Sequence, residues 1–134
     1  MNYDYSCPHC KGHLRVNDQI IVTAKKENGT FGMLLLDPQL GDYSIVNHPS
    51  FDYEEGEKLD IHCPMCNEDL AVKGKDYNLA KIHMEDHVGT EFDIYFSTIV
   101  GEKVTYKIKG EEMEVFGDEI EKYTNFFGEP LNYF

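Results

Sequence analysis

The chain has 134 residues, enough for one ordinary domain with a substantial core, and 41% of them are hydrophobic. Asp and Glu number 25 against 12 Lys and Arg, and the resulting net charge of −13 argues against direct binding to nucleic-acid phosphates. The start of the chain lacks a basic and apolar leader, and the longest apolar run, residues 33–36, is too short for a membrane span. We therefore expect a cytoplasmic protein.

The first motif has the pattern Cys-Pro-x-Cys-x-x-x-Leu and runs from Cys7 to Leu14. Two thiolates three positions apart can hold one tetrahedral metal ion from a tight turn, and the leucine is expected to begin the strand that leaves this turn. The tetrapeptide of residues 7–10 also resembles the motif of thioredoxin-fold oxidoreductases. That chemistry needs a strand before the motif and a helix after it, whereas only six residues precede Cys7.

A β-hairpin is predicted after the first motif. Residues 19–25 are rich in β-branched side chains, Asn28-Gly29 is a typical two-residue hairpin turn, and residues 30–36 form the returning strand. Residues 43–46 are a further short strand candidate. Together these elements form an insertion between the first motif and its repeat.

The second motif repeats the first pattern from Cys63 to Leu70, so that no cysteine is left over. In a chain without a secretory leader, this usage favours metal ligation by Cys7, Cys10, Cys63 and Cys66 over disulfide bonds. Residues 5–16 and 56–72 resemble the zinc-ribbon family, including its rubredoxin-like knuckle. The resemblance implies one structural four-cysteine site and a β-ribbon around it. Zinc is the expected ion, and iron is the alternative because four sulfur ligands do not distinguish the two.

The chain departs from this family at one position of each motif. The family often has glycine after the second cysteine, where this sequence has Lys11 and Asn67. The segment of 52 residues from 11 to 62 is also longer than the usual spacing of a ribbon, which is why an inserted element is expected.

An antiparallel β-meander of four strands is predicted for the second half, from alternating apolar residues and three glycine-containing turns. The first turn is a three-residue loop at 87–89, the second lies around Gly101, and the third is Gly110-Glu111. The predicted cross-strand pairs are Ile82 with Ile94, Met84 with Phe92, His83 with Asp93, Phe96 with Ile108, Ile108 with Met113 and Lys107 with Glu114.

A second metal arrangement has to be weighed against the four-cysteine site. Cys63 and Cys66 could combine with His83 and His87 as in a two-Cys/two-His finger, if residues 78–88 formed a helix. This arrangement leaves Cys7 and Cys10 without obvious partners. The predicted strand register places His83 opposite a carboxylate, which favours the four-cysteine site.

A short helix is predicted at residues 119–127, with Asp118 as its N-cap and Gly128 as its stop. The tail that follows is rich in Tyr, Phe and Leu, and we expect it to cover one face of the meander rather than to bind a partner. The domain organisation predicted is a zinc ribbon with an inserted hairpin at 1–76, and a meander with a short helix at 77–134. The two parts are expected to pack as one continuous domain, mainly β.

No catalytic motif was found, neither a glycine-rich phosphate loop nor a Gly-x-Ser-x-Gly elbow nor a His-Glu-x-x-His pair. A closed four-sulfur site also has no open position for a substrate. We therefore expect a structural or protein-interaction module and not an enzyme, with another protein or a second copy as its partner. The alternative is a zinc ribbon that acts through protein contacts within a transcription or translation assembly.

Overall fold

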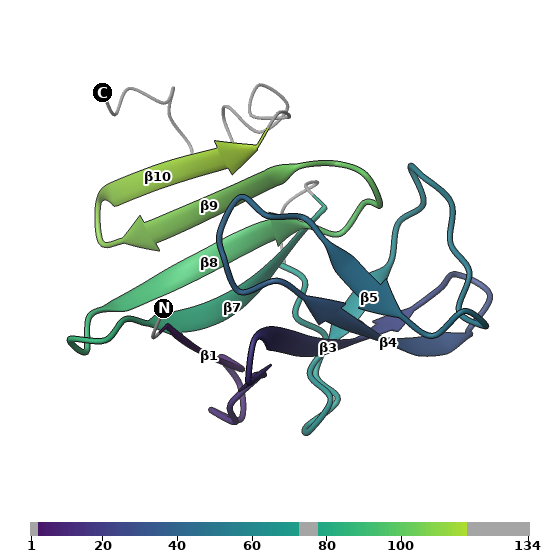
Figure 1. The fold of residues 1–134 in the computed structure, drawn as a ribbon, viewed down its shortest axis with the longest axis horizontal. Coiled ribbons are helices and arrows are strands. Elements are labelled where there is room, and N and C mark those ends of the chain that lie inside the picture. The colour runs from purple at the N-terminus through teal and green to yellow at the C-terminus, as the bar shows by residue number, and fades with distance from the viewer. Residues whose placement is uncertain (1–2, 73–77, 118–134) are drawn as a thin grey trace.

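The computed structural model describes residues 3–72 and 78–117, which form ten β-strands and no helix (Figure 1). The strands form two antiparallel sheets, here named sheet A and sheet B. Sheet A has the order β1 (Asp4–Ser6), β7 (Leu79–Glu85), β8 (Glu91–Ser97), β9 (Val104–Lys109) and β10 (Glu112–Gly117). Sheet B has the order β2 (Arg15–Val16), β3 (Gln19–Lys25), β4 (Phe31–Leu36) and β5 (Ile45–Asn47), and β6 (Asp60–His62) also pairs with β3.

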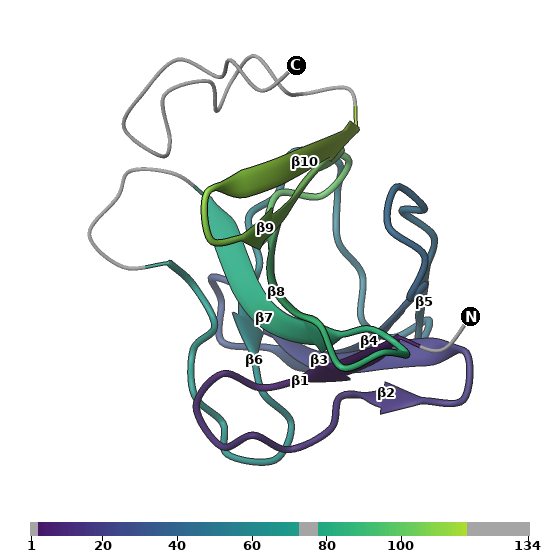
Figure 2. The same ribbon diagram turned by 90° about the vertical axis from the view of Figure 1, so that its left-hand side faces the viewer.

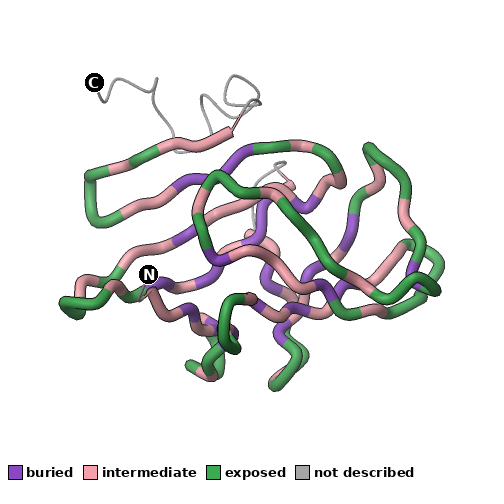
Figure 3. The backbone as a smooth tube through the Cα atoms, viewed as in Figure 1, coloured by how far each residue is buried: buried purple, intermediate pink, exposed green. Residues whose placement is uncertain are grey.

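The main core lies between the inner faces of the two sheets. Alternate residues of β3 and β7, such as Val22 and Ile82, are buried there, as the two-residue period of a half-buried strand requires. Leu34 of β4 and Ile94 of β8 join the same cluster. Buried residues accordingly gather where the sheets face each other, and exposed residues gather in the loops (Figures 2 and 3).

Each strand that leads into a cysteine motif pairs with a strand from the other half of the chain, and we call this arrangement the exchange of β1 and β6. β1 leads into the first motif but pairs with β7, the strand that leaves the second motif. β6 leads into the second motif and pairs with β3, which follows the first motif after the short strand β2. Each motif is therefore tied by backbone hydrogen bonds to both sheets.

This exchange is part of an internal repeat. The unit β3-β4-β5 has the same strand order and register as β7-β8-β9, with a constant offset of 60 positions, as from Gly29 to Gly89. Leu36 pairs with Ile45 in the first unit, and Phe96 pairs with Thr105 in the second.

The turns of the two units agree as closely as their strands. Gly29 and Gly89 have φ angles of 89° and 88°, and Gly41 and Gly101 have φ angles of 91° and 86°, all in the left-handed region that glycine adopts without strain. The β4–β5 and β8–β9 loops each contain a 3.1 Å backbone hydrogen bond, from Asp42 to Gln39 and from Glu102 to Ile99. The described residues thus form two similar halves, with β10 added to the second.

Several predicted pairs are confirmed, and one register is wrong. The β7–β8 and β9–β10 pairs occur as expected, including Ile82 with Ile94 and Lys107 with Glu114. Phe96 does not face Ile108, because it pairs with Thr105. The reason is that β9 is apolar on a second face: Val104 and Tyr106 are buried with Leu79 in a smaller cluster on the other side of sheet A.

The remaining predictions for local structure have mixed outcomes. The hairpin turn has three residues, 27–29, closed by the Lys26 N–H to Thr30 carbonyl hydrogen bond of 2.9 Å, and not the two residues expected. The strand predicted at 43–46 is confirmed in part, because β5 covers Ile45–Asn47 and residues 43 and 44 lie in the loop before it. The helix at 119–127 and the aromatic tail lie outside the described residues. The division at residue 76 stays a prediction. No helix that could span a membrane occurs in residues 3–72 and 78–117.

Candidate metal centre

The two cysteine motifs fold into the same backbone turn. In the first, the Lys11 N–H donates to the Cys7 carbonyl at 2.9 Å, and the Cys7 N–H donates to the Gly12 carbonyl at 2.9 Å. In the second, the Asn67 N–H donates to the Cys63 carbonyl at 2.9 Å and the Cys63 N–H to the Glu68 carbonyl at 3.0 Å. The spacing of the motif therefore produces two knuckles with the same hydrogen bonds.

The residue after the second cysteine adopts the left-handed conformation in both knuckles. The φ angle is 64° at Lys11 and 62° at Asn67. Glycine is the usual residue for this conformation, and asparagine tolerates it better than most side chains. The two knuckles therefore share this backbone conformation without a glycine, at a cost of about 1 kcal/mol for Lys11.

The four sulfur atoms gather at one point between the knuckles. All of them lie within 4.8 Å of one another. The Cys7–Cys66 and Cys10–Cys63 sulfur pairs, each joining one knuckle to the other, are both 3.8 Å apart. A tetrahedron with metal–sulfur bonds of ~2.3 Å has edges of about 3.8 Å, whereas a disulfide requires ~2.05 Å. The arrangement thus fits a tetrahedral metal ion and not a pair of disulfides.

Backbone N–H groups surround the sulfur atoms on the knuckle side. The Cys7 sulfur accepts from His9 N at 3.3 Å, the Cys63 sulfur from Met65 N at 3.4 Å, and the Cys10 sulfur from Gly12 N at 3.4 Å. Four thiolates carry two more negative charges than a divalent ion neutralises. These donors offset part of that excess, as hydrogen bonds around metal ligands commonly do.

Burial and hydrogen bonding act differently on the inner two thiols. Burial raises the pKa of Cys7 to about 12. Burial also acts to raise the pKa of Cys63, but N–H groups of Cys66 and Met65 and the neighbouring sulfurs outweigh it and lower that pKa. Because a metal binds thiolates, binding must displace the Cys7 proton, and the affinity for metal must fall as the pH falls.

The centre lies where the core meets the surface. Cys7 and Cys63 are fully buried, Cys10 is exposed, and Cys66 is partly exposed. The leucines of the two motifs, Leu14 and Leu70, are buried in the main core, and their N–H groups donate to Tyr5 and Ile61 on the entering strands. An ion held by these sulfurs would therefore hold the two knuckles together, and with them the strands β1 and β6 that lead into the knuckles.

The histidines of the alternative finger site lie elsewhere. His83 is on β7, where its Nε2 is 2.9 Å from a carboxylate oxygen of Glu91 and its Nδ1 is 3.9 Å from Asp93. His87 is in the exposed β7–β8 loop. Neither belongs to the cysteine cluster, which is the only group of metal-binding side chains found among the described residues.

The double variant His83→Ala with His87→Ala is expected to keep its full metal content, because neither imidazole belongs to the cluster of four sulfurs. Elemental analysis of the purified variant against wild type measures this directly. A lower metal content in the double variant than in wild type would instead support the two-Cys/two-His arrangement.

Comparisons with protein-family models, with curated proteins and with solved structures found no match to this chain. The assignment of a metal-binding centre therefore depends on the geometry of its own four cysteines.

Proposed function

We propose that this chain is a non-enzymatic protein-interaction module whose fold is stabilised by one structural zinc ion on Cys7, Cys10, Cys63 and Cys66. Four sulfurs complete the coordination of a tetrahedral ion, which leaves no position for a substrate or an activated water. Iron would fit the same four ligands, and zinc is favoured because it gives a redox-inert structural site.

The observation that carries the interaction role is an apolar outer face on sheet B. Phe31 and Met33 of β4 and Val46 of β5 are 53%, 55% and 54% exposed. In the second half of the repeat, the positions of Phe31 and Met33 are occupied by Glu91 and Asp93. The fold therefore accepts charged residues at these positions, and apolar side chains that are more than half exposed on one half favour a binding surface, although the Lys25 Nζ atom lies 5.5 Å from the centre of the Phe31 ring.

The edge of sheet B suggests how a partner binds. β5 is the last strand of this sheet, whereas its counterpart β9 is covered by β10. Residues 43–51, which include β5, contain no Asp, Glu, Lys or Arg, although charged side chains commonly protect such edges. We therefore infer that an extended segment of the partner adds to β5, as β10 adds to β9.

Charge favours a neutral or basic partner. A second copy would carry the same net charge of −13 and be repelled, and nucleic acid would be repelled as well. Two lysines of sheet A also have acidic neighbours across the strands, with Lys107 3.7 Å from Glu114 and Lys81 3.9 Å from Asp93. Such pairs are typical of a solvated face.

The variant Val46→Lys tests this surface. The lysine places a charge on the β5 edge, so a partner captured from the native cell by wild type is expected to be lost, with the melting temperature unchanged. The matched control is Val88→Lys, at an equally small apolar residue that is 72% exposed in the β7–β8 loop. Retention of the same partner by Val46→Lys, or equal loss of the partner in the control, would rule out the β5 edge as the binding surface. Self-association of the purified chain that Val46→Lys abolishes would instead identify a second copy as the partner.

A further inference from the structure

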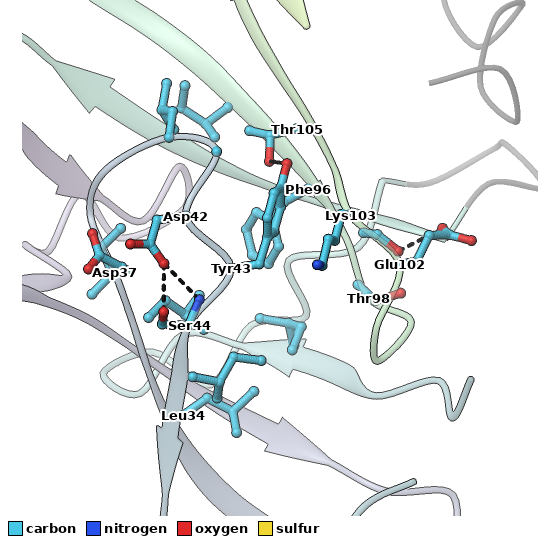
Figure 4. A pocket seen from close by; sticks show the side chains of 18 of the residues that line it. Leu34, Asp37, Asp42, Tyr43, Ser44, Phe96, Thr98, Glu102, Lys103 and Thr105 are labelled. Carbon is cyan, nitrogen blue, oxygen red and sulfur yellow. Dashed lines mark hydrogen bonds between the residues drawn. The ribbon is translucent and has the colours of Figure 1, made fainter. Parts of the chain in front are cut away.

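A cavity of about 180 Å³ lies between the two sheets, beneath the β4–β5 and β8–β9 loops (Figure 4). None of the four cysteines lines it, so it is separate from the metal centre. Its inner wall consists of core side chains from both sheets, namely the Tyr5 ring, whose hydroxyl donates to the Pro38 carbonyl, and the aliphatic residues Ile20, Leu34, Ile61, Ile82 and Ile94.

The internal repeat produces this cavity. Leu34 and Ile94 occupy equivalent positions in β4 and β8, and they face the cavity from opposite sheets. The two loops above them share the same glycine turn, at Gly41 and Gly101. The cavity is thus shaped by the way in which the two halves pack, with one loop from each half at its mouth.

A hydroxyl pair lies at this mouth. The Tyr43 and Thr105 hydroxyl oxygens are 2.9 Å apart (Figure 4). This hydrogen bond connects the β4–β5 loop of the first half to strand β9 of the second half across the opening. Thr105 is only 5% exposed, and a hydroxyl has one donor and two acceptor positions, so Thr105 retains capacity for a ligand. The equivalent of Thr105 in the first half is Ile45, which shows that the fold does not require a polar side chain there.

The charges around the mouth are mainly negative. Asp37, Asp42 and Glu102 line it together with one cation, Lys103. The Ser44 hydroxyl and N–H donate to the Asp42 carboxylate at 2.7 and 3.0 Å, and these bonds lower the pKa of Asp42, so this carboxylate is ionised at neutral pH. An anionic ligand would therefore be disfavoured.

We propose that this cavity binds a small uncharged molecule, with the bulk of a single ring and one hydroxyl or carbonyl group. The size follows from comparison with an engineered protein cavity of ~150 Å³, lined by Leu, Ile and Phe, which binds benzene. The apolar wall takes the ring, and the polar group meets the Thr105 hydroxyl at the mouth. This site and the β5 edge are independent proposals, because Ile45 and Val46 point to opposite faces of β5.

Phenol and benzoate are the probes, since they share a ring and differ in charge at neutral pH. Phenol is expected to shift the methyl NMR signals of Leu34, Ile82 and Ile94 in the full-length metal-bound protein, in a saturable way. Benzoate is expected to bind at least about tenfold more weakly, a difference of about 1.4 kcal/mol. Ile45→Trp should block the mouth and weaken phenol binding by a similar factor. Val46→Trp, on the other face of the same strand, is the matched control and should bind phenol as wild type does.

Two results would overturn the proposal. Phenol shifts that do not saturate, or that spread over surface methyl groups, would show that the cavity does not hold a ring. Benzoate binding as tight as phenol binding would show that the ligand class is wrong. The methyl shifts are measured on the wild type and so remain decisive even if Ile45→Trp does not fold.

Discussion

Cys63→Ser is expected to abolish both tight metal binding and cooperative unfolding. Cys63 is fully buried, belongs to the 3.8 Å sulfur pair with Cys10 and follows the strand β6 that is exchanged into sheet B. Structural zinc contributes about 10–16 kcal/mol in zinc-finger peptides, comparable to the whole stability of about 5–15 kcal/mol typical of a domain. Loss of one thiolate therefore removes enough stability to unfold the chain.

The measurement is thermal unfolding followed by circular dichroism, together with metal analysis of the reduced protein. Met65→Ser is the matched control, because Met65 is exposed in the same knuckle and its backbone N–H, not its side chain, bonds the Cys63 sulfur. The control should keep its metal and a sharp transition. A Cys63→Ser protein that melts as cooperatively as wild type would show that the metal is not part of the fold's stability.

Leu70→Ala is expected to lower the free energy of unfolding by about 3 kcal/mol, within the range of about 2–5 kcal/mol found for buried leucines. Leu70 is buried in the main core just after the second knuckle, and its N–H donates to Ile61 at 2.8 Å. The substitution leaves a cavity under the metal centre but removes no ligand, so the metal should remain bound in the folded protein.

Urea unfolding of the metal-bound protein measures this loss. The control is Val16→Ala, at an exposed residue of β2, which should change the stability by less than about 0.5 kcal/mol. Because the repeat places Leu14 under the first knuckle in the same way, Leu14→Ala should cost a similar amount. If Leu70→Ala were as stable as Val16→Ala, the knuckle would not pack on the core as described.

The cysteine cluster could be predicted from sequence because its signal is local. Each knuckle needs two cysteines three positions apart and one buried leucine, and these residues are visible in both motifs. The β7–β8 pairing was predicted for a similar reason, since one short loop and one apolar face determine its register. The two knuckles are more than fifty positions apart, but their pairing followed from the repeated motif, because one tetrahedral ion needs four ligands and each knuckle supplies two.

The β8–β9 register could not be predicted in this way. The rule of alternation assumes that one face of a strand is buried, but β9 buries Thr105 against one cluster and Tyr106 against another. With both faces occupied, the period of two residues no longer selects a register. The loop between the two strands, at residues 98–103, is too long to determine the register by itself.

The exchange of β1 and β6 has no signal in the sequence. The pairing of β1 with β7 joins residues about eighty positions apart, and no local pattern distinguishes it from pairing with β3. A weak signal of the repeat was nevertheless present: Leu40-Gly41-Asp42 and Val100-Gly101-Glu102 share the pattern apolar-glycine-acidic at the same offset as Gly29 and Gly89. These two segments form the mouth of the cavity.

X-ray absorption spectroscopy of the purified, reduced protein identifies the ion and its ligands together. We expect one zinc ion per chain, surrounded by four sulfur atoms at ~2.3 Å and by no nitrogen or oxygen ligand. A spectrum with nitrogen in the first coordination shell would contradict the four-cysteine centre, and so would a reduced protein that holds no metal.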